Sequence, residues 1–428
     1  MNSATTRCRF IVSTGLAGAL LVSAFLQPAV ASIPPRTPLP SVYTLPPQAL
    51  ADARTRLTAG PEAPDLAPAI KQLRAEADAA LERKPVSVLD KNLVPASGDK
   101  HDYVSIGPYW WPNPSTADGL PWISRDGHNS PHSLAGTDRN AFAATCNDTL
   151  TLGLAWYLTG YEPYARHAAR ILRVWFLDQS TRMNPNLRHA QSVPGRTDGD
   201  KIGVIDGAIF VSFLDGLALV ETSPVWTPAD AKAMRAWFTD YLVWLTTSPQ
   251  GRGAAAMSNN HGTWYDAQLS QIALFLGHNE LARTTLGSAL ARRLETQVDD
   301  DGSQPHEVIR ASPLGYSTFN ANGFLCLALQ ASHVDQNLAA QWWGNPLFRK
   351  AIEYIAPYAD SRACWISPHG KGGNQTGARL PIRTLLAKAS GNYTDEAFRT
   401  LLTPQLTGPN ASDYAAERWH FFVARPNP

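Results

Sequence analysis

Apolar residues recur at spacings of three and four along most of the chain, which is the pattern of a helix with one buried face. Leu150, Leu154 and Leu158 are one example. Strict alternation of apolar and polar positions, which would indicate strands, is rare and short. The spacing therefore predicts an all-α protein, with helices over residues 64–84, 140–159, 164–177, 203–221, 228–248, 260–276, 280–297, 317–332, 346–356, 381–390 and 395–402.

Loops join these helices in pairs, and no short sequence repeat is evident. A simple bundle of so many helices would leave several of them far from a common core. We therefore predict an α/α toroid, which is an incomplete α/α barrel, built by a single domain over residues 65–428. Its long loops should gather around a substrate cleft at one end, as loops on a rigid scaffold do, and they cover residues 101–133, 184–201 and 299–313.

The N-terminal residues have the features of a secretory signal peptide. Arg7 and Arg9 precede an apolar run over residues 11–25, and a small-residue cleavage site ends at Ala31. A single transmembrane anchor is the alternative, but the run is short for a membrane span and no similar run follows. We expect removal of residues 1–31, a periplasmic or secreted protein without a membrane span, and a Pro-rich extended lead-in over residues 32–64.

The composition narrows the possible partners. The chain of 428 residues is 44% hydrophobic and 17% charged, so it can bury a large core. Its formal net charge of +1 supplies no overall field for nucleic acid, and no nucleic-acid partner is expected. Thirteen Trp residues suit sugar rings as well as a core. After signal removal Cys146, Cys326 and Cys364 remain, which permits at most one intramolecular disulfide, and the oligomeric state stays open.

The segment SNNHGTWYD concentrates side chains that can carry chemistry. It places Asn259, Asn260, His261, Trp264 and Tyr265 near the start of a predicted helix. Asparagine is also a common N-cap, so helix capping beside an ordinary histidine is the alternative interpretation. The two asparagines cannot both be the cap, and the two polar-tipped rings exceed what capping requires. These residues are therefore candidates for a catalytic or binding site.

A second cluster lies in DGSQPHEVIRASPLGYSTFN, residues 301–320. A Ser-Pro-Leu-Gly turn separates Arg310 from Tyr316, which stands at the start of an apolar helix. Each residue alone is explained by a solvated arginine or a half-buried tyrosine. Together with Asn and His, however, these types meet the demands of β-elimination on a uronic acid polymer. Donors neutralise the carboxylate beside the C5 proton, a base removes that proton, and an acid protonates the departing O4.

Four segments resemble the alginate lyase superfamily of polysaccharide lyases: KHDYVSIGPYWWPNP, MNPNLRHAQSVPGR, NNHGTWYD, and QPHEVIR with LGYSTFN. They fall within residues 100–324, and NNHGTWYD is the most specific. The resemblance implies an α/α toroid and a lyase that acts on an anionic polysaccharide. It also implies that Asn260 and His261 neutralise the carboxylate or remove the proton. Arg310 would then hold the substrate and the catalytic tyrosine, and Tyr316 would be acid, base or both.

The resemblance leaves the uronate open. Better-known periplasmic alginate lyases follow Asn-Asn-His with residues other than Gly262-Thr263-Trp264, so mannuronan, mixed alginate and glucuronan are all candidate substrates. In β-mannuronate or β-glucuronate the C5 proton and O4 leave from one face, and Tyr316 can serve as base and acid. In α-guluronate they lie on opposite faces, and His261 would be the base. A cation such as Arg310 is expected to lower the pKa of Tyr316.

Further residues are candidates for holding the polymer. Tyr109, Trp110, Trp111 and Trp122 could stack on sugar rings, although they could equally form the core of their own loop. Arg196 could contact a neighbouring carboxylate, although a solvated turn arginine is equally consistent with its position.

Metal and cofactor signals are weak, and we expect neither. His128 and His132 have helical spacing, but Ser130-Pro131 between them opposes a helix, and no HExxH or Gly-rich loop after a strand is present. Two other classes stay open, an α/α-barrel glycoside hydrolase and a non-catalytic polysaccharide-binding protein. The hydrolase would need a pair of carboxylates, and no pair stands out among Asp102, Asp138, Asp148, Asp206 and Glu307.

Overall fold

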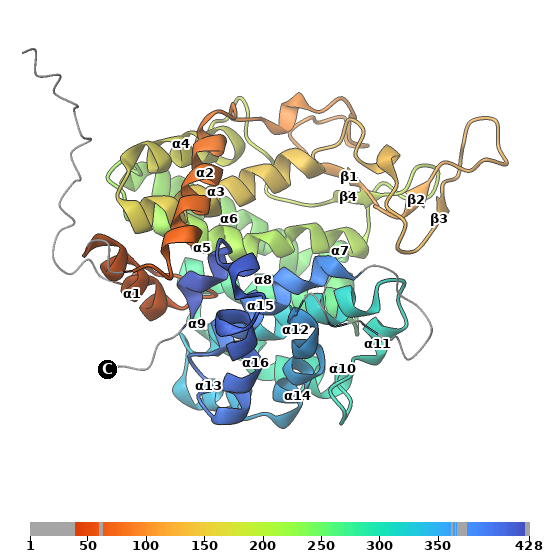
Figure 1. Ribbon diagram of the computed structural model, residues 1–428. Coiled ribbons are helices and arrows are strands. Elements are labelled where there is room, and N and C mark those ends of the chain that lie inside the picture. The colour runs from red at the N-terminus through yellow and green to blue at the C-terminus, as the bar shows by residue number, and fades with distance from the viewer. Residues whose placement is uncertain (1–38, 60–62, 361–362, 364, 366–374, 424–428) are drawn as a thin grey trace, which may run out of the picture.

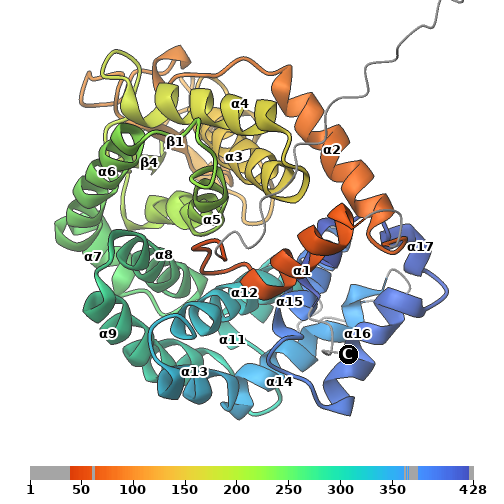
Figure 2. The same cartoon turned by 90° about the vertical axis from the view of Figure 1, so that its left-hand side faces the viewer.

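Helices dominate the structure, as the hydrophobic spacing predicted. The computed structural model describes residues 39–59, 63–360, 363, 365 and 375–423. Figures 1 and 2 show the helices arranged as a ring in two layers, with the chain running around it. The predicted all-α toroid is therefore confirmed. The predicted cleavage point after Ala31 and the third cysteine, Cys364, lie outside the described residues.

The inner layer consists of helices that are buried on most sides, and each contacts the next around the ring. In chain order they are α3 (Arg139–Thr159), α5 (Phe210–Val220), α8 (Asn260–Leu276), α12 (Pro313–Ala331) and α15 (Arg379–Ala389). The outer helices bury mainly one face, and they are α2 (Ala67–Leu81), α4 (Glu162–Leu172), α6 (Pro228–Thr247), α9 (Asn279–Ala289), α13 (Gln336–Trp343), α14 (Pro346–Ile355) and α16 (Glu396–Thr407).

Shorter helices and turns connect the two layers. The α-helical ones are α7 (Pro249–Ala255), α10 (Glu295–Gln297), α11 (Pro305–Val308) and α17 (Ala411–Tyr414). The 3-10 and π turns are η1 (Val88–Asp90), η2 (Pro131–Ser133), η3 (Arg173–Leu177), η4 (Lys201–Ile209), η5 (Leu290–Leu294), η6 (Ala356–Ala359), η7 (Thr376–Ala378) and η8 (Arg418–Phe422).

Aromatic side chains fill the space between the layers on one side of the ring. The ring of Phe210 in α5 lies 5.9 Å from that of Trp237 and 5.2 Å from that of Phe238, both in α6. The stretch Lys201–Val220 is long and apolar enough to cross a membrane by length and composition. However, 67% of its most apolar window is buried inside the fold, which fits its place in the inner layer.

The strands are short and lie toward one end of the ring. β1 (Val104–Ile106) pairs in parallel with β4 (His189–Ser192), and β2 (Trp110–Trp111) pairs antiparallel with β3 (Ile123–Ser124). Figure 1 shows both pairs away from α1 (Pro47–Thr58), which lies toward the other end. The pairing of β1 with β4 joins two of the loops that were predicted to meet, residues 101–133 and 184–201.

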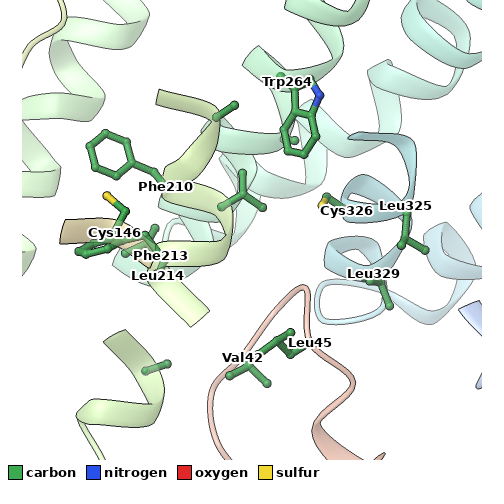
Figure 3. Packing of buried hydrophobic residues seen from close by; sticks show 14 of the residues in the cluster. Val42, Leu45, Cys146, Phe210, Phe213, Leu214, Trp264, Leu325, Cys326 and Leu329 are labelled. Carbon is green, nitrogen blue, oxygen red and sulfur yellow. The ribbon is translucent and has the colours of Figure 1, made fainter. Parts of the chain in front are cut away.

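The lead-in before the toroid differs from the sequence prediction, which expected residues 32–64 to be extended. Within its described part, α1 is helical, and the segment before α1 enters the centre of the ring (Figure 2). Val42 is fully buried below the inner helices (Figure 3). The buried carboxylate of Asp215 accepts hydrogen bonds from the backbone amides of Tyr43 and Thr44, at 2.7 and 2.9 Å. The lead-in is therefore part of the core.

Helix α8 carries most of the candidate residues, and local chemistry fixes where it begins. Asn259 is its N-cap, because the side-chain oxygen accepts a hydrogen bond from the backbone N–H of His261. A Cβ at Gly262 would lie 2.1 Å from the carbonyl oxygen of Met257 and 2.4 Å from Nη1 of Arg293. Only glycine permits this close approach, so Gly262 lets the Arg293 side chain pack against the first turn.

Candidate functional site

A cavity of about 800 Å³ is lined in part by Trp110 of β2 and Ser124 of β3. Its walls come from α3, η4, α8, α12 and the loop around β2, and Thr44 of the lead-in contributes to its lining. Most of the residues predicted from sequence to form the site line this one cavity, although they come from segments far apart in the chain: Tyr109, Trp110, Asn260, His261, Trp264, Arg310 and Tyr316.

Asn260 is held by a carboxylate behind the cavity wall. Its backbone N–H and its side-chain Nδ2 donate hydrogen bonds to the two carboxylate oxygens of Glu307, both at 2.8 Å. Burial raises the pKa of Glu307, and the two bonds from Asn260 oppose that rise. The Asn260 side chain is 2% exposed, so its orientation is fixed. An amide nitrogen has two N–H donors, and the second is left for a ligand in the cavity.

His261 follows directly and presents a neutral imidazole. Its Nδ1 atom is buried and has no hydrogen-bond partner in the described part of the chain. Burial, and after it the charge of Arg310, lower the pKa of His261 to about 4. The ring is therefore uncharged near neutral pH and offers one nitrogen that donates and one that accepts. A neutral imidazole with a free nitrogen can accept a proton or hydrogen-bond a carboxylate.

Tyr316 joins a short network of polar groups at the cavity wall. Its hydroxyl lies 2.6 Å from the hydroxyl of Tyr109, and Nη2 of Arg310 donates a hydrogen bond to it at 2.9 Å. Burial and the contact with Tyr109 raise the pKa of Tyr316 above its ordinary value of 10.0, and Arg310 opposes this only in part. Arg310 thus lowers the pKa of Tyr316 as expected, but burial and Tyr109 raise it by more, so the net shift in the free protein is upward. The phenol is protonated and can act as a proton donor.

Arg310 is anchored by Asp126, which the sequence analysis did not identify. Nη2 and Nε of Arg310 donate to the two carboxylate oxygens of Asp126, at 2.8 and 3.3 Å. These bonds hold the pKa of Asp126 below its usual range. The pair joins the loop after β3 to the segment before α12, so it fixes the guanidinium next to Tyr316. Asp126 gives no local sequence signal, because 184 residues separate it from Arg310.

Two of the predicted aromatic residues, Trp264 and Trp110, line the cavity, and each packs against a neighbouring side chain. The Trp264 indole stacks on Phe319 with ring centroids 4.9 Å apart, and its Nε1 donates to the Phe319 carbonyl. The guanidinium of Arg196 lies 5.2 Å from the Trp110 ring and its Nε donates to the carbonyl oxygen of Trp122. Arg196 does not line the cavity itself, so the structure places it behind Trp110.

Other predicted binding residues lie outside the cavity wall. Asn259 is occupied as the helix cap, and the buried hydroxyl of Tyr265 donates to the carbonyl oxygen of Leu245. Trp111 and Trp122 each pack edge-on against His132, with ring centroids 6.4 Å apart. Positions of this kind fit the alternative interpretations of capping, core packing and a packed loop.

The carboxylates considered for a hydrolase are mostly engaged elsewhere. Asp206 lines the cavity, and its oxygens accept hydrogen bonds from Tyr103, Ser105 and Gln191 at 3.0, 2.6 and 2.8 Å. Asp126, the other carboxylate in the lining, is paired with Arg310 and has a lowered pKa, which does not suit a general acid. Of the other four that were considered, three have partners outside the cavity: Asp102 with Asn184, Asp138 with Lys91, and Asp148 with Arg83. The fourth, Glu307, accepts two hydrogen bonds from Asn260.

Two further cavity residues were not recognised from the sequence. Gln191 has a φ of 46°, the one positive φ of a non-glycine residue in the described segments. Arg139 lines the cavity from the first turn of α3. Gln191 stands within the quoted segment MNPNLRHAQSVPGR, but nothing in that segment indicates a strained backbone. Among the described residues, no group of three or more His, Cys, Asp or Glu side chains is placed to hold a metal ion.

Comparison with known proteins places this geometry in a family context. The family model described as alginate lyase matches residues 87–365. The crystal structure of an alginate lyase from Bacteroides ovatus has 33% sequence identity and a TM-score of 0.81, and the match covers 90% of this chain and 100% of that one. A variant of alginate lyase A1-III complexed with tetrasaccharide shares the fold at 15% identity and a TM-score of 0.51, over 84% of this chain and 90% of that one. No curated protein matches the chain.

Proposed function

The chain belongs to the alginate lyase family, and from that premise we propose that it is a polysaccharide lyase that cleaves alginate or a related polyuronate by β-elimination. The observation that carries the proposal is the convergence of Asn260, His261, Arg310 and Tyr316 on one cavity, with Arg310 donating directly to the Tyr316 hydroxyl. A set of three donors beside a proton-transfer group is what elimination next to a carboxylate requires.

Charge neutralisation falls to the donors around the substrate carboxylate. The free N–H of Asn260 and a nitrogen of His261 hydrogen-bond the carboxylate of the sugar that loses its C5 proton, and the Arg310 guanidinium adds positive charge nearby. Because burial and Glu307 fix Asn260, its dipole is already oriented before the substrate arrives. Such preorganised donors stabilise the enolate-like transition state more than the ground state.

Proton transfer follows from the protonation states. Tyr316 is protonated in the free protein, so it is ready to donate its proton to the departing O4. His261 is neutral and has an unpartnered nitrogen, so it is ready to accept the C5 proton when that proton lies on the opposite face of the sugar. For a substrate that loses both groups from one face, Tyr316 must first lose its own proton. The Tyr109 hydroxyl at 2.6 Å can pass that proton on to solvent by releasing its own proton as it accepts the one from Tyr316.

A product assay separates this function from its alternatives. The purified protein is incubated with mannuronan, guluronan, glucuronan and neutral mannan, and ultraviolet absorbance of the C4–C5 double bond is followed together with reducing ends. A lyase produces both signals on at least one polyuronate and neither on mannan. Reducing ends without absorbance would indicate a hydrolase, and neither signal on any polymer that binds would indicate a binding protein; either result contradicts the proposal.

The proposed setting of the enzyme is outside the cytoplasm. The N-terminal run of basic, apolar and small residues supports removal of a signal peptide after Ala31. Expression with the full N-terminus and sequencing of the mature N-terminus test this. A mature chain that begins at Ser32 is expected, whereas an intact N-terminus in the cytoplasmic fraction contradicts export.

A further inference from the structure

Arg139 is a cation in the cavity that the proposed reaction does not use. It is the first residue of α3, and its side chain lines the cavity. Its Nη1 atom is buried without a hydrogen-bond partner, and the side chain forms no ion pair within the described residues. A guanidinium carries five N–H donors and keeps its charge at any pH at which the protein is folded. A buried donor without a partner costs free energy, which an entering anion would recover.

The other guanidinium in the cavity lining, that of Arg310, is bound by protein groups. Arg310 donates to both oxygens of Asp126 and to the hydroxyl of Tyr316. Its charge is largely balanced and its position is fixed by the protein itself. Arg139 has no such carboxylate within the described part of the chain, so its charge is available to a ligand.

Asp206 lies on the same side of the cavity as Arg139 but does not pair with it. Three neutral donors already bind its carboxylate, from Tyr103, Ser105 and Gln191. Tyr103 connects the two residues, because its hydroxyl bonds Asp206 while its ring packs against Phe142, one turn after Arg139, at 5.3 Å. These neutral donors satisfy the aspartate without using the arginine.

Gln191 gives a second, independent sign that this wall is built for a ligand. Its φ of 46° is unfavourable for a side chain with a Cβ, and such strain persists mainly where surrounding contacts enforce it for function. Here the backbone N–H of Gln191 donates to Ser105 Oγ at 2.8 Å, and its Nε2 donates to Asp206. Both bonds hold the Gln191 side chain in the cavity lining.

Arg139 and Gln191 line the same cavity as the reacting groups but belong to other elements of the fold. The pKa of His261 is lowered by the charge of Arg310 and raised by that of Asp206, so the imidazole lies within electrostatic reach of both residues. Arg310 and Tyr316 reach the cavity from the segment before α12 and from its first turn, whereas Arg139 and Gln191 reach it from α3 and β4. A cavity of about 800 Å³ is in the range that encloses a ligand larger than a single sugar ring.

We propose that Arg139, with Gln191 beside it, forms a second carboxylate-binding site, which holds the uronate next to the one that loses its C5 proton. The inference rests on the proposed function, since it takes the ligand to be a polyuronate. The planar guanidinium can bind a carboxylate through two parallel N–H donors, which fixes orientation as well as affinity. This site would bind a polymer that carries a charge on every residue and would disfavour one whose charges are spaced further apart.

Binding of charged and uncharged versions of one ligand tests the proposal. Calorimetry measures binding of a mannuronate tetramer, and of the same tetramer with every carboxyl group methyl-esterified, to the Tyr316→Phe protein, which is used so that the ligand is not consumed. Adding Arg139→Gln is expected to weaken binding of the free acid roughly tenfold to a hundredfold, as expected for one charge-assisted hydrogen-bonded pair. Binding of the ester is expected to change less than about threefold.

The variant and its controls exclude a merely structural effect. Arg188→Gln removes an exposed arginine near the same wall that does not line the cavity, and it should leave both affinities unchanged. Arg139→Lys keeps the charge but loses the planar fork, so it should weaken the free acid severalfold and spare the ester. This variant also serves if Arg139→Gln does not fold, as judged by its melting temperature.

The outcomes of these experiments test the second carboxylate site and the lyase activity independently of each other. Equal losses for acid and ester, or no loss for either, would overturn the assignment of Arg139 to a carboxylate. If the parent protein with Tyr316 forms no unsaturated product from any polyuronate but the charge-dependent loss is found, the lyase proposal fails while the anion site stands. If unsaturated product forms and Arg139→Gln binds acid and ester like its parent, only the second site fails.

Discussion

Two clusters of arginine and carboxylate lie beside α8, and they differ in how completely their donors are used. At Asp266 both neighbouring arginines converge on one carboxylate that is fully buried: Nη2 of Arg292 donates to its oxygens at 3.0 and 2.9 Å, and Nε of Arg293 donates at 2.7 Å. The remaining Arg293 donors bind the carbonyl oxygens of Met257 and Ala255, both at 2.6 Å. We call this set the closed cluster.

The second set, Asp126, Arg310, Tyr316 and Tyr109, faces the cavity, and we call it the open cluster. Its carboxylate is exposed, and its guanidinium is shared between the carboxylate and a phenol. The comparison shows that a buried arginine is not by itself a sign of function. Where two arginines converge on one buried carboxylate, the charges hold the protein together; where a proton-bearing group and open space remain beside the arginine, they can act on a ligand.

The largest expected effect comes from removing one oxygen of the open cluster. Tyr316→Phe keeps the ring over which Arg310 packs at 4.0 Å, and deletes the group that carries the proton. Turnover on the preferred polyuronate should fall by about 10³-fold or more, because general acid–base groups contribute at this scale. The rate of unsaturated product formation measures the change, and the melting temperature should stay within a few degrees.

Tyr109→Phe is the matched control for that variant, since it removes the partner hydroxyl and not the proposed proton carrier. Its loss should be smaller than that of Tyr316→Phe. If Tyr316→Phe keeps substantial activity while Tyr109→Phe loses it, the roles of the two tyrosines are exchanged. If both keep it, the open cluster does not carry the proton.

The next effect concerns the closed cluster and should appear in stability. Asp266→Asn leaves the buried Arg293 and the exposed Arg292 without their carboxylate, and loss of a buried charge partner typically costs about 3–5 kcal/mol. Chemical denaturation should show this loss, whereas turnover well below the transition should change by less than about tenfold because no group of the cavity is removed. Asp240→Asn, an exposed position on α6, serves as the control and should be nearly neutral. A stable Asp266→Asn protein would contradict the assignment of this cluster to stability.

The sequence predicts the helices of the ring better than it predicts the N-terminal segment that enters the ring. Helices such as 260–276 and 346–356 follow from apolar spacing, which is a local property, and they agree with α8 and α14. The insertion of Tyr43 and Thr44 into the ring depends on Asp215, which lies 171 and more residues away. No local pattern records that pairing, so the Pro-rich segment suggested an extended lead-in. The burial of Asp215 and its bonds are consequences of the closed ring.

The same limit applies within the site. Tyr316 and the Asn-His pair were recognisable because uncommon combinations of residue types stand close in sequence. The choice between Asn259 and Asn260 was not, since either amide could have capped α8, and only the geometry assigns the cap to Asn259. Asp126 lies in a loop, Gln191 in a short strand and Arg139 at a helix start. Each can be recognised only from its partner in the folded protein, its backbone geometry or its lack of a partner among the described residues.

A smaller loss is expected when the neutralising donors of the cavity are removed one at a time. Asn260→Ala and His261→Ala should each reduce turnover by roughly 10²-fold, the scale of one donor that acts on the transition state. His306→Ala is the matched control for the histidine, because His306 is exposed and outside this cavity. Asn260→Ala also removes the side-chain hydrogen bond to the buried Glu307, although the backbone N–H still donates to it, so its stability should drop as well, whereas that of His261→Ala should not. Near-normal turnover in both variants would falsify their role.

The smallest effect is a pH dependence of stability that arises from His261, which lies near the Arg310 of the open cluster. Its pKa in the folded protein is about 4, below the ordinary 6.5, since burial and Arg310 disfavour the charged ring. Between these values the unfolded chain takes up a proton that the folded protein refuses, so this residue makes stability fall as pH falls from 6.5 toward 4. Lowering the pH from 7 to 5 should cost the parent protein on the order of 1–2 kcal/mol more than His261→Gln, with other groups cancelling in the difference. Denaturant unfolding of both proteins at the two pH values measures it. Equal losses in the two proteins would mean that burial and Arg310 do not keep His261 neutral in the folded protein.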